Sequence, residues 1–147
     1  MIKKEAFKTI SQIIPHRPPM LMIDGYKRID NNNALSEKKF GGGDYGCENK
    51  IVIDSILIEC VAQTVAAHYG YQSLLKKEKN PEIGMLVSVD AFDFYHPVFE
   101  NSKIEIFISK TDRIGAFKLF KGEIRIKNKI IASGNIKVFN PKKRDNL

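Results

Sequence analysis

Cysteine is scarce in this sequence, and the two cysteines that it has follow no recognised metal or disulfide pattern. Cys47 and Cys60 occur without a CxxC motif and without the Cys/His spacing of a zinc module. Small secreted domains and zinc sites need several such residues at short, regular spacings. The sequence therefore predicts no metal site and no disulfide framework, and reduced thiols in a cytosolic protein are expected.

Long uninterrupted apolar runs are missing as well. The first residues, MIKKEAFKTISQIIPH, have charges throughout and lack the apolar segment of a signal peptide. The most apolar stretch, Ser55 to Leu75, contains Glu59, Gln63 and His68, which a bilayer disfavours. We therefore expect no export signal, no membrane span and a cytoplasmic location, with residues 55–75 forming a buried helix.

Acidic residues are outnumbered by basic ones. The chain has 24 Lys and Arg against 17 Asp and Glu, a net charge of +7, and a pI near 9.4. The lysines are scattered and lack the interleaved aromatic residues of a nucleic-acid-binding surface. The densest basic cluster is Lys142-Lys143-Arg144, in a tail that begins with Pro141. Most of this charge is expected to be solvated surface, with no nucleic-acid partner.

The chain is long enough for one hydrophobic core. Its 147 residues include 43% hydrophobic and 28% charged residues, as in an ordinary globular domain. No internal repeat or linker precedes Pro141. We predict a single domain over residues 1–140 and a basic tail over residues 141–147.

Turn residues divide the first part of the sequence into short elements. A weak helical period covers Lys4 to Ile14, and Met20 to Ile23 indicates the start of a buried strand. Asn31-Asn32-Asn33 predicts the turn of a hairpin over residues 26–40. The glycines of residues 41–46 lack the phosphate-loop pattern and predict a flexible loop.

The rest of the sequence predicts one long helix followed by strands. Asp54 is the predicted N-cap of a helix that runs to about Lys77, closed by Asn80-Pro81. Beyond it, alternating and β-branched residues between turn signals are typical of an antiparallel sheet. These features favour an α+β protein in which a sheet wraps around a single helix. The predicted strands cover residues 83–95, 103–110, 116–127 and 130–138.

One face of the predicted helix combines a carboxylate with small residues. At about 100° per residue, Gln63 lies about 40° from Glu59, whereas His68 lies about 180° away. Ala66 and Gly70 lie on the Glu59 side, so another element is able to approach closely. Glu59 is then either a chemically active group or a surface acid favoured by the helix dipole. The residues alone leave both interpretations open, and His68 is expected to be a buried histidine bonded to backbone.

Three segments together resemble a known family. PHRPPMLMID, LIECVAQTVAAHYG and GMLVSVDAFDFYHPV resemble, in order and spacing, the hotdog-fold 3-hydroxyacyl-[acyl-carrier-protein] dehydratases. The combination of PHRPPM with an ECVAQ-type helix is most similar to the branch found in aryl-polyene biosynthesis. The resemblance extends from Phe7 to Phe139.

The resemblance implies a hotdog fold, a long central helix wrapped by a curved antiparallel sheet of about five or six strands. It also implies a homodimer or a heterodimer with another hotdog protein, joined edge to edge. The acidic residue that the family has on its helix matches Glu59, and Gln63 completes the Glu-x-x-x-Gln pattern. This match favours a functional Glu59.

The sequence departs from the housekeeping enzymes at the second catalytic group. Their His-Phe-Pro histidine would fall at Tyr45, and no histidine stands between Arg17 and Glu59. Three alternatives follow: a dehydratase in which His16 replaces that histidine, a thioesterase or hydratase that uses Glu59 differently, or a binding subunit without catalysis. The prolines around His16 stiffen the turn, as a catalytic group requires, although a hydrogen bond across the turn is the structural alternative. His96, before Pro97, is expected to be structural.

The reaction that the resemblance implies is dehydration of a 3-hydroxyacyl thioester on an acyl carrier protein. It needs a base for the C2 proton, an acid for the C3 hydroxyl and donors for the enolate oxygen. His16 and Glu59 are predicted as base and acid, and the amides of Ser55 and Ile56 as donors. No cofactor is expected, because phosphopantetheine belongs to the substrate. Gln63 is a predicted substrate-binding residue, and the predicted acyl-binding residues are Met20, Met22 and Phe92.

Overall fold

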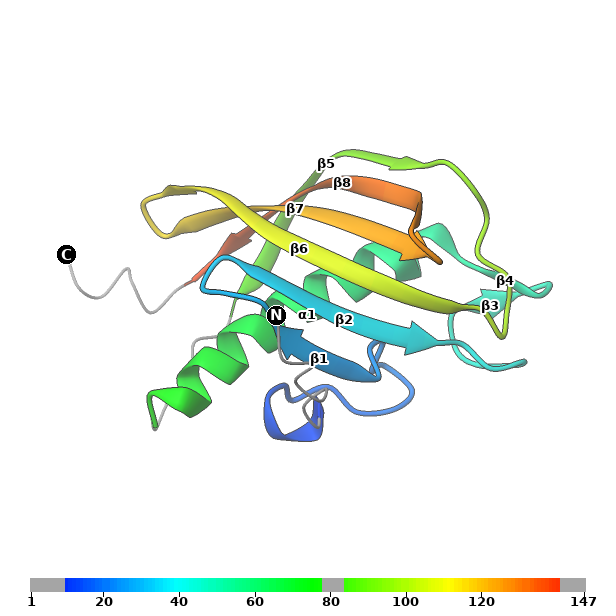
Figure 1. Cartoon of the computed structure of the whole chain (residues 1–147), viewed down its shortest axis with the longest axis horizontal. Helices are drawn as coiled ribbons and strands as arrows, with labels where there is room; N and C mark the ends of the chain where they lie inside the picture. Colours follow the sequence, from blue (N-terminus) through cyan, green and yellow to red (C-terminus); the bar gives the residue numbers. More distant parts are fainter. Residues whose placement is uncertain (1–9, 78–83, 141–147) are drawn as a thin grey trace.

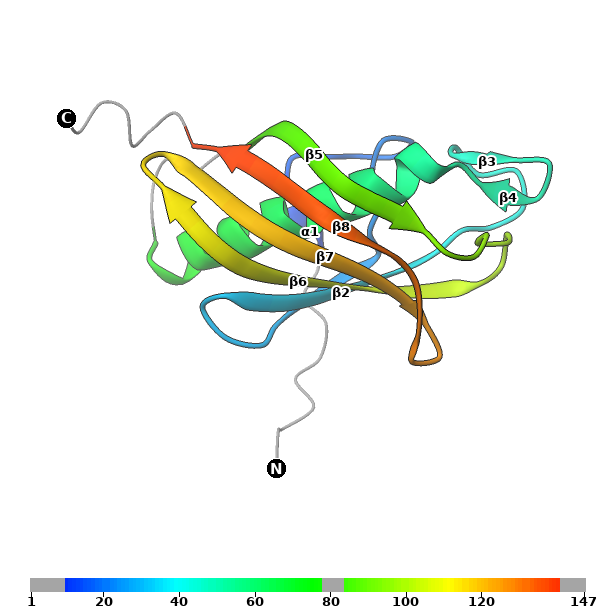
Figure 2. The same ribbon diagram turned by 90° about the horizontal axis from the view of Figure 1, so that it is seen from above.

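The computed structural model describes residues 10–77 and 84–140. A single long helix, α1 (Asp54–Leu75), lies against the concave side of a six-stranded antiparallel sheet (Figure 1). Seen from above, the strands curve around the helix axis (Figure 2). This arrangement confirms the predicted helix wrapped by a curved sheet, and its strand number agrees with the prediction.

In the sheet, β1 and β2 form a hairpin, and β6, β7 and β8 form a meander. Its strand order is β1-β2-β6-β7-β8-β5, with β1 and β5 at the two edges. A short ribbon of β3 and β4 precedes the helix, and a 3₁₀ turn, η1, precedes the sheet. The bounds are η1 Ile10–Gln12, β1 Gly25–Arg28, β2 Asn33–Lys39, β3 Cys47–Glu48, β4 Ile51–Val52, β5 Met85–Phe94, β6 Lys103–Ile114, β7 Phe117–Ile126 and β8 Lys129–Phe139.

The core lies between α1 and the sheet. Ile104, Ile106 and Ile108 alternate along β6 and are buried, as expected for a strand with one face on the core. Burial of each such side chain stabilises the fold by about 1.5–3 kcal/mol. At Gly122 on β7, an added Cβ would lie 2.5 Å from a methyl of Val61, so only glycine lets the helix come this close.

The predicted start of the first strand and the predicted N-cap of the helix are wrong. Met20 to Ile23 is not a strand, because the main chain there bonds to the Gln63 side chain of α1, and β1 starts only at Gly25. Asp54 is the first helical residue, and the N-cap position is taken by Ile53 without a side-chain hydrogen bond. The helix ends at Leu75 rather than Lys77.

Other boundaries differ by a few residues. Of the helix predicted over Lys4 to Ile14, the described part shows only η1 and a turn, and residues 4–9 lie outside the described residues. The strand predicted to end at residue 110 continues as β6 to Ile114. Asn80-Pro81 and the tail of residues 141–147 also lie outside the described residues, so the predicted domain limits stay a prediction.

Strand β5 is an unprotected apolar edge. It pairs with β8 on one side only, and two register shifts interrupt that pairing. Met85, Leu86, Val87 and Val89 on it are exposed, so both faces of the strand present apolar side chains. Such an edge is typical of a surface that another strand covers. None of the described helices is long and apolar enough to cross a membrane.

Candidate active site

A small cavity brings together His16 and Glu59, which stand far apart in the sequence. Its volume is about 130 Å³, and it lies between α1, the segment before Met20, and the β5–β8 side of the sheet. Gln63 and small or apolar residues such as Ala62 and Ala66 form the rest of its wall. The structure thus places the predicted base and acid in one cavity.

Glu59 lies on the face of α1 that the helical phase predicted. Its side chain is half-buried, and its Oε1 accepts a hydrogen bond of 2.9 Å from Nε2 of Gln63, one turn along the helix. Gln63 thus holds one of the two carboxylate oxygens of Glu59. The pairing confirms that the two residues share a face.

Gln63 fixes the segment that leads away from His16. Its Oε1 accepts from the Met22 amide at 2.7 Å, and its Nε2 donates to the Met20 carbonyl at 2.8 Å as well as to Glu59. The side chain is only 1% exposed, so these bonds satisfy a buried amide group. The structure therefore gives Gln63 a positioning role, and the predicted contact with substrate stays a prediction.

The turn around His16 is held by Arg17. The guanidinium of Arg17 donates to the carbonyls of Ile14 at 2.9 Å, His16 at 2.8 Å and Ser11 at 3.1 Å. The sequence analysis did not predict this role. The available signal was the position of Arg17 in a proline-rich turn that directly follows a helical segment. Nδ1 of His16 is buried and has no hydrogen-bond partner among the described residues. The ring as a whole is half-buried and lines the cavity, and histidine is the side chain best suited to proton exchange near neutral pH.

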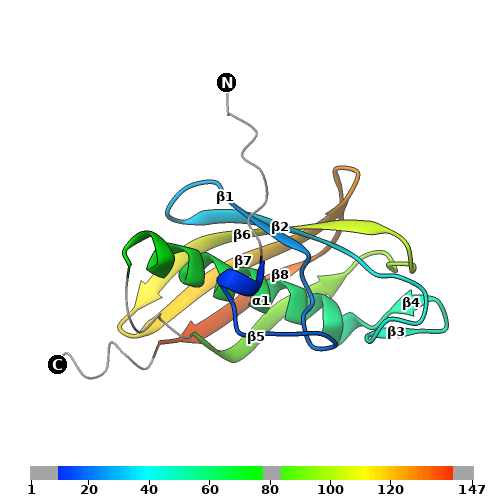
Figure 3. The same cartoon turned by 90° about the horizontal axis from the view of Figure 1, so that it is seen from below.

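A larger apolar cavity adjoins the first. It measures about 370 Å³ and is lined by residues 11–17 together with Ala66, Gly70 and Gly84. His16, Ala66 and Gly84 line both cavities. At Gly70 an added Cβ would lie 1.8 Å from the Ile13 carbonyl oxygen, so the N-terminal segment rests directly on the helix. The predicted close approach at Gly70 is confirmed, and the approaching element is this segment (Figure 3).

The predicted acyl-binding residues lie elsewhere. Met22 is buried in the core, Met20 is 52% exposed, and Phe92 packs on Phe94 and on Gly134 of β8. None of the three predicted residues lines either cavity. The acyl-binding role of Met20, Met22 and Phe92 therefore stays a prediction.

The start of α1 is not brought to the cavity either. The Ile56 amide donates to the Ile53 carbonyl at 2.9 Å, and the Gly46 backbone packs on the Ile56 side chain. Ser55 is exposed and lines neither cavity. The role predicted for the Ser55 and Ile56 amides as donors to the substrate therefore stays a prediction.

His68 has a structural position, as predicted, and the structural role expected of His96 stays a prediction. His68 is buried, and its Nε2 donates to the Asn31 carbonyl at 2.8 Å, so its Nδ1 accepts from the Tyr26 hydroxyl at 2.6 Å. Burial is the main cause that lowers the pKa of His68, and burial also raises the pKa of Tyr26. His96 is exposed after β5, and Tyr45, at the position of the missing histidine, is exposed as well.

The cysteines and acids form no metal centre. Cys60 is buried, Cys47 is partly buried, and both are free thiols. Burial raises the pKa of both thiols. Within residues 10–77 and 84–140, no three His, Cys, Asp or Glu side chains gather as metal ligands.

Known proteins resemble most of the chain. It is 26% identical over 130 residues to the 3-hydroxyacyl-[acyl-carrier-protein] dehydratase FabZ of Anaeromyxobacter sp. (strain K), covering 84% of this chain and 82% of that protein. It is 29% identical over 136 residues to the FabZ of Rhodopseudomonas palustris (strain TIE-1), covering 87% of each.

A solved structure and a family model extend the likeness. The dehydratase heterocomplex ApeI:P from Xenorhabdus doucetiae matches with a TM-score of 0.83 at 18% identity over 96% of both chains, and the hotdog fold is thereby confirmed. The family model described as ApeP dehydratase matches residues 8–147. The chain therefore belongs to the ApeP-like dehydratase family.

Proposed function

We propose that this protein removes water from a 3-hydroxyacyl thioester on an acyl carrier protein and leaves the trans-2-enoyl thioester. The observation that supports this most directly is the shared cavity of His16 and Glu59, next to an apolar cavity lined by residues 11–17. The relatives that are named 3-hydroxyacyl-[acyl-carrier-protein] dehydratases support the same reaction. Fatty-acid-like or polyene biosynthesis is the corresponding pathway class.

The two side chains divide the proton transfers. His16 takes the C2 proton, the electron pair of that C–H bond forms the C2=C3 double bond, and the C3–O bond breaks. Glu59, protonated on Oε2, gives its proton to the departing hydroxyl, which leaves as water. Gln63 keeps Glu59 in place through Oε1. Transfer of the proton from His16 back to Glu59 completes the cycle, and no cofactor takes part.

The acyl chain is proposed to lie in the adjoining apolar cavity. His16, Ala66 and Gly84 line both cavities, so a thioester placed beside Glu59 can extend its chain along the segment of residues 11–17. A volume of about 370 Å³ accommodates a medium-sized acyl group. The acyl-binding role predicted for Met20, Met22 and Phe92 is separate from this assignment and stays a prediction.

A second hotdog chain, identical or different, is proposed to cover β5. The exposed apolar residues of this edge strand support the pairing, and Leu86 on β5 also lines the Glu59 cavity. The ApeI:P complex is an example of a heterocomplex with this fold. Gel filtration of the purified protein should show at least a dimer, and a stable monomer would contradict the pairing.

An acidic acyl carrier protein is the proposed macromolecular partner. The net charge of +7 favours encounter with an acidic surface, so association should weaken as salt is added. Association that does not change with salt would contradict this contribution of charge. A cytoplasmic location is proposed to accompany this partner.

The test follows water loss by mass spectrometry on a 3-hydroxyacyl carrier protein, with the chain alone and with its hotdog partner. Wild type, Glu59→Gln and His16→Gln are compared, and His96→Gln is the matched control, since His96 is exposed and outside the cavity. Water loss should be slower in Glu59→Gln and His16→Gln than in wild type, and unchanged in His96→Gln. Release of free thiol would instead identify a thioesterase. Binding of the carrier without turnover, with the partner present, would identify a non-catalytic subunit.

A further inference from the structure

The two cavities of the candidate active site meet beside one residue of α1. Three described residues line both cavities: His16 in the proline-rich turn, Ala66 on α1, and Gly84 just before β5. Glu59 lines only the smaller cavity, and Gly70 lines only the larger one. Among the described residues, Ala66 is therefore the point of α1 that borders the passage between the two cavities.

The spacing along the helix separates this passage from the reacting carbons of the proposed substrate. At a rise of about 1.5 Å per residue, Ala66 lies about 10 Å beyond Glu59 along the helix axis, and Gly70 lies about 16 Å beyond it. A 3-hydroxyacyl group whose C3 lies at Glu59 therefore reaches Ala66 only through the far carbons of a long chain.

The side chain of Ala66 borders free space. Ala66 is partly exposed, although the neighbouring Val65 and Ala67 are 1% and 0% exposed. Because Ala66 lines both cavities, its exposed methyl group faces them. Apolar side chains such as those of Ile13 and Ile14 line the larger cavity, and they suit a hydrocarbon chain.

The turn on the other side of the passage is held by hydrogen bonds. The guanidinium of Arg17 donates to three carbonyls of this turn, and the side chain of Gln63 bonds the main chain at Met20 and Met22. A side chain larger than alanine at position 66 would have to break some of these bonds to push the turn away. The width of the passage is therefore sensitive to the volume of this one side chain.

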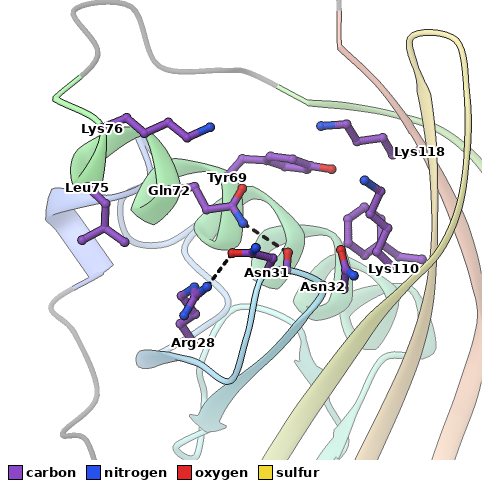
Figure 4. A pocket seen from close by; sticks show the side chains of 10 residues that line it. Arg28, Asn31, Asn32, Tyr69, Gln72, Leu75, Lys76, Lys110 and Lys118 are labelled. Atoms are coloured by element: carbon purple, nitrogen blue, oxygen red, sulfur yellow. Dashed lines mark hydrogen bonds between the residues drawn. The ribbon is translucent and has the colours of Figure 1, made fainter.

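The cavity at the end of α1 is not a continuation of the passage. It measures about 340 Å³, lies on the other side of the helix, and is enclosed by the helix end, the β1–β2 turn and strands β6 and β7 (Figure 4). Arg28, Lys110 and Lys118 contribute to its cationic wall. Arg28 donates to Oδ1 of Asn31, and Nζ of Lys118 lies 4.2 Å from the centre of the Tyr69 ring. This cavity shares no lining residue with either cavity of the candidate active site, so the acyl cavity does not lead into it.

We propose that Ala66 determines which acyl chains the protein accepts, because its single methyl group lets a long, unbranched chain pass from the Glu59 cavity into the apolar cavity. This assignment rests on the proposed function. A short chain ends before it reaches Ala66, whereas a long chain lies across it. Ala66 thus contributes to the choice of substrate and not to the proton transfers.

The test measures kcat/KM for 3-hydroxybutyryl and 3-hydroxydodecanoyl carrier protein, with the hotdog partner present. Ala66→Leu should lower the value for the dodecanoyl substrate by about tenfold or more and leave the value for the butyryl substrate within about threefold of wild type. Ala66→Val should give a smaller loss of the same kind. Activity on the butyryl substrate also shows that each variant is folded.

Two control variants have the same alanine-to-leucine change elsewhere. Ala62 lines only the smaller cavity, so Ala62→Leu should slow both substrates by similar factors. Ala116 lies in the turn between β6 and β7 and lines neither cavity, so Ala116→Leu should leave both substrates within about twofold of wild type. Equal losses for both chain lengths in Ala66→Leu, or a loss confined to the long chain in Ala62→Leu, would overturn the proposal.

Binding measurements separate this proposal from the proposed reaction. Titration calorimetry uses butyryl and dodecanoyl analogues of acyl-pantetheine in which an amide replaces the thioester and no hydroxyl is present to be lost. Wild type should bind the dodecanoyl analogue more tightly than the butyryl analogue, and Ala66→Leu should lose this preference. That result in a protein without dehydratase activity would refute the reaction and support the role of Ala66. Dehydration of both thioesters without a selective loss in Ala66→Leu would refute the role of Ala66 alone, and a wild type that does not prefer the dodecanoyl analogue would also contradict it.

Discussion

On each of its two faces, α1 holds a non-helical segment through one buried side chain. On one face the buried side chain of Gln63 holds the main chain of Met20 and Met22, and on the other the buried side chain of His68 holds the Asn31 carbonyl. The first face adds a carboxylate and an apolar cavity, whereas the second adds a cationic wall. One helix thereby positions two non-helical segments, and the side chains beside each segment determine the chemistry.

The largest expected effect separates the two faces. Glu59→Gln should lower turnover by about 10²- to 10⁴-fold, because proton transfer to the leaving hydroxyl is lost. Arg28→Gln, on the second face, should leave turnover within about twofold of wild type. Steady-state kinetics of the two variants measure this difference. An equal loss of turnover in both variants would join the two cavities into one functional unit.

Gln63→Leu, on the first face of α1, should lower the stability of the protein. The Met22 amide and the Met20 carbonyl lose their partner, so the free energy of unfolding should fall by about 2–4 kcal/mol in urea titrations. Gln72→Leu is the matched control, since Gln72 also bonds one carbonyl but from a less buried position. Equal losses in the two variants would contradict the difference in burial.

Gly70→Ala should have a smaller but clear effect. The new Cβ would meet the Ile13 carbonyl, so the segment of residues 11–17 must shift, at a cost of about 1–3 kcal/mol. Gly84→Ala is the control, because its Cβ would meet only ordinary contacts with Val138 at 3.8 Å. Thermal unfolding of both variants measures the difference. An unchanged melting temperature for Gly70→Ala would show that the segment does not rest on the helix.

The smallest expected effect concerns the pH dependence of the second face. Burial, reinforced by Arg28 and Lys118, lowers the pKa of His68, and the bond to Asn31 and the charge of Asp30 only partly oppose this. The unfolded chain therefore takes up the proton first.

Stability should accordingly be full above the ordinary pKa of 6.5 and fall as the pH drops below it. The slope approaches about 1.4 kcal/mol per pH unit. Urea titrations from neutral to mildly acidic pH should show a flatter profile for His68→Gln, and the same slope in both proteins would rule His68 out as the cause.

Local patterns predicted more of the fold than of the site. The helical phase correctly paired Glu59 with Gln63 and separated both from His68, since three-residue and four-residue spacings alone determine a helix face. Met20 to Ile23 was misassigned, because an apolar run beside a turn signal does not reveal that a distant glutamine will bond its main chain.

Contacts between distant segments were also hidden from the sequence. The gathering of Arg28, Lys110 and Lys118 depends on strand order, which brings β6 and β7 beside the turn of β1 and β2. Scattered lysines therefore looked like solvated surface charge. The same holds for Arg17, whose bonds to three nearby carbonyls follow from the shape of the turn around His16.

The most direct test of the proposed mechanism is whether His16 and Glu59 act as one unit. Turnover of a 3-hydroxyacyl carrier protein is measured for wild type, His16→Gln, Glu59→Gln and the double variant, with the hotdog partner present. The double variant should be no slower than the slower single variant, because each group needs the other in the same step. Losses that multiply in the double variant, or a His16→Gln enzyme as fast as wild type, would contradict it.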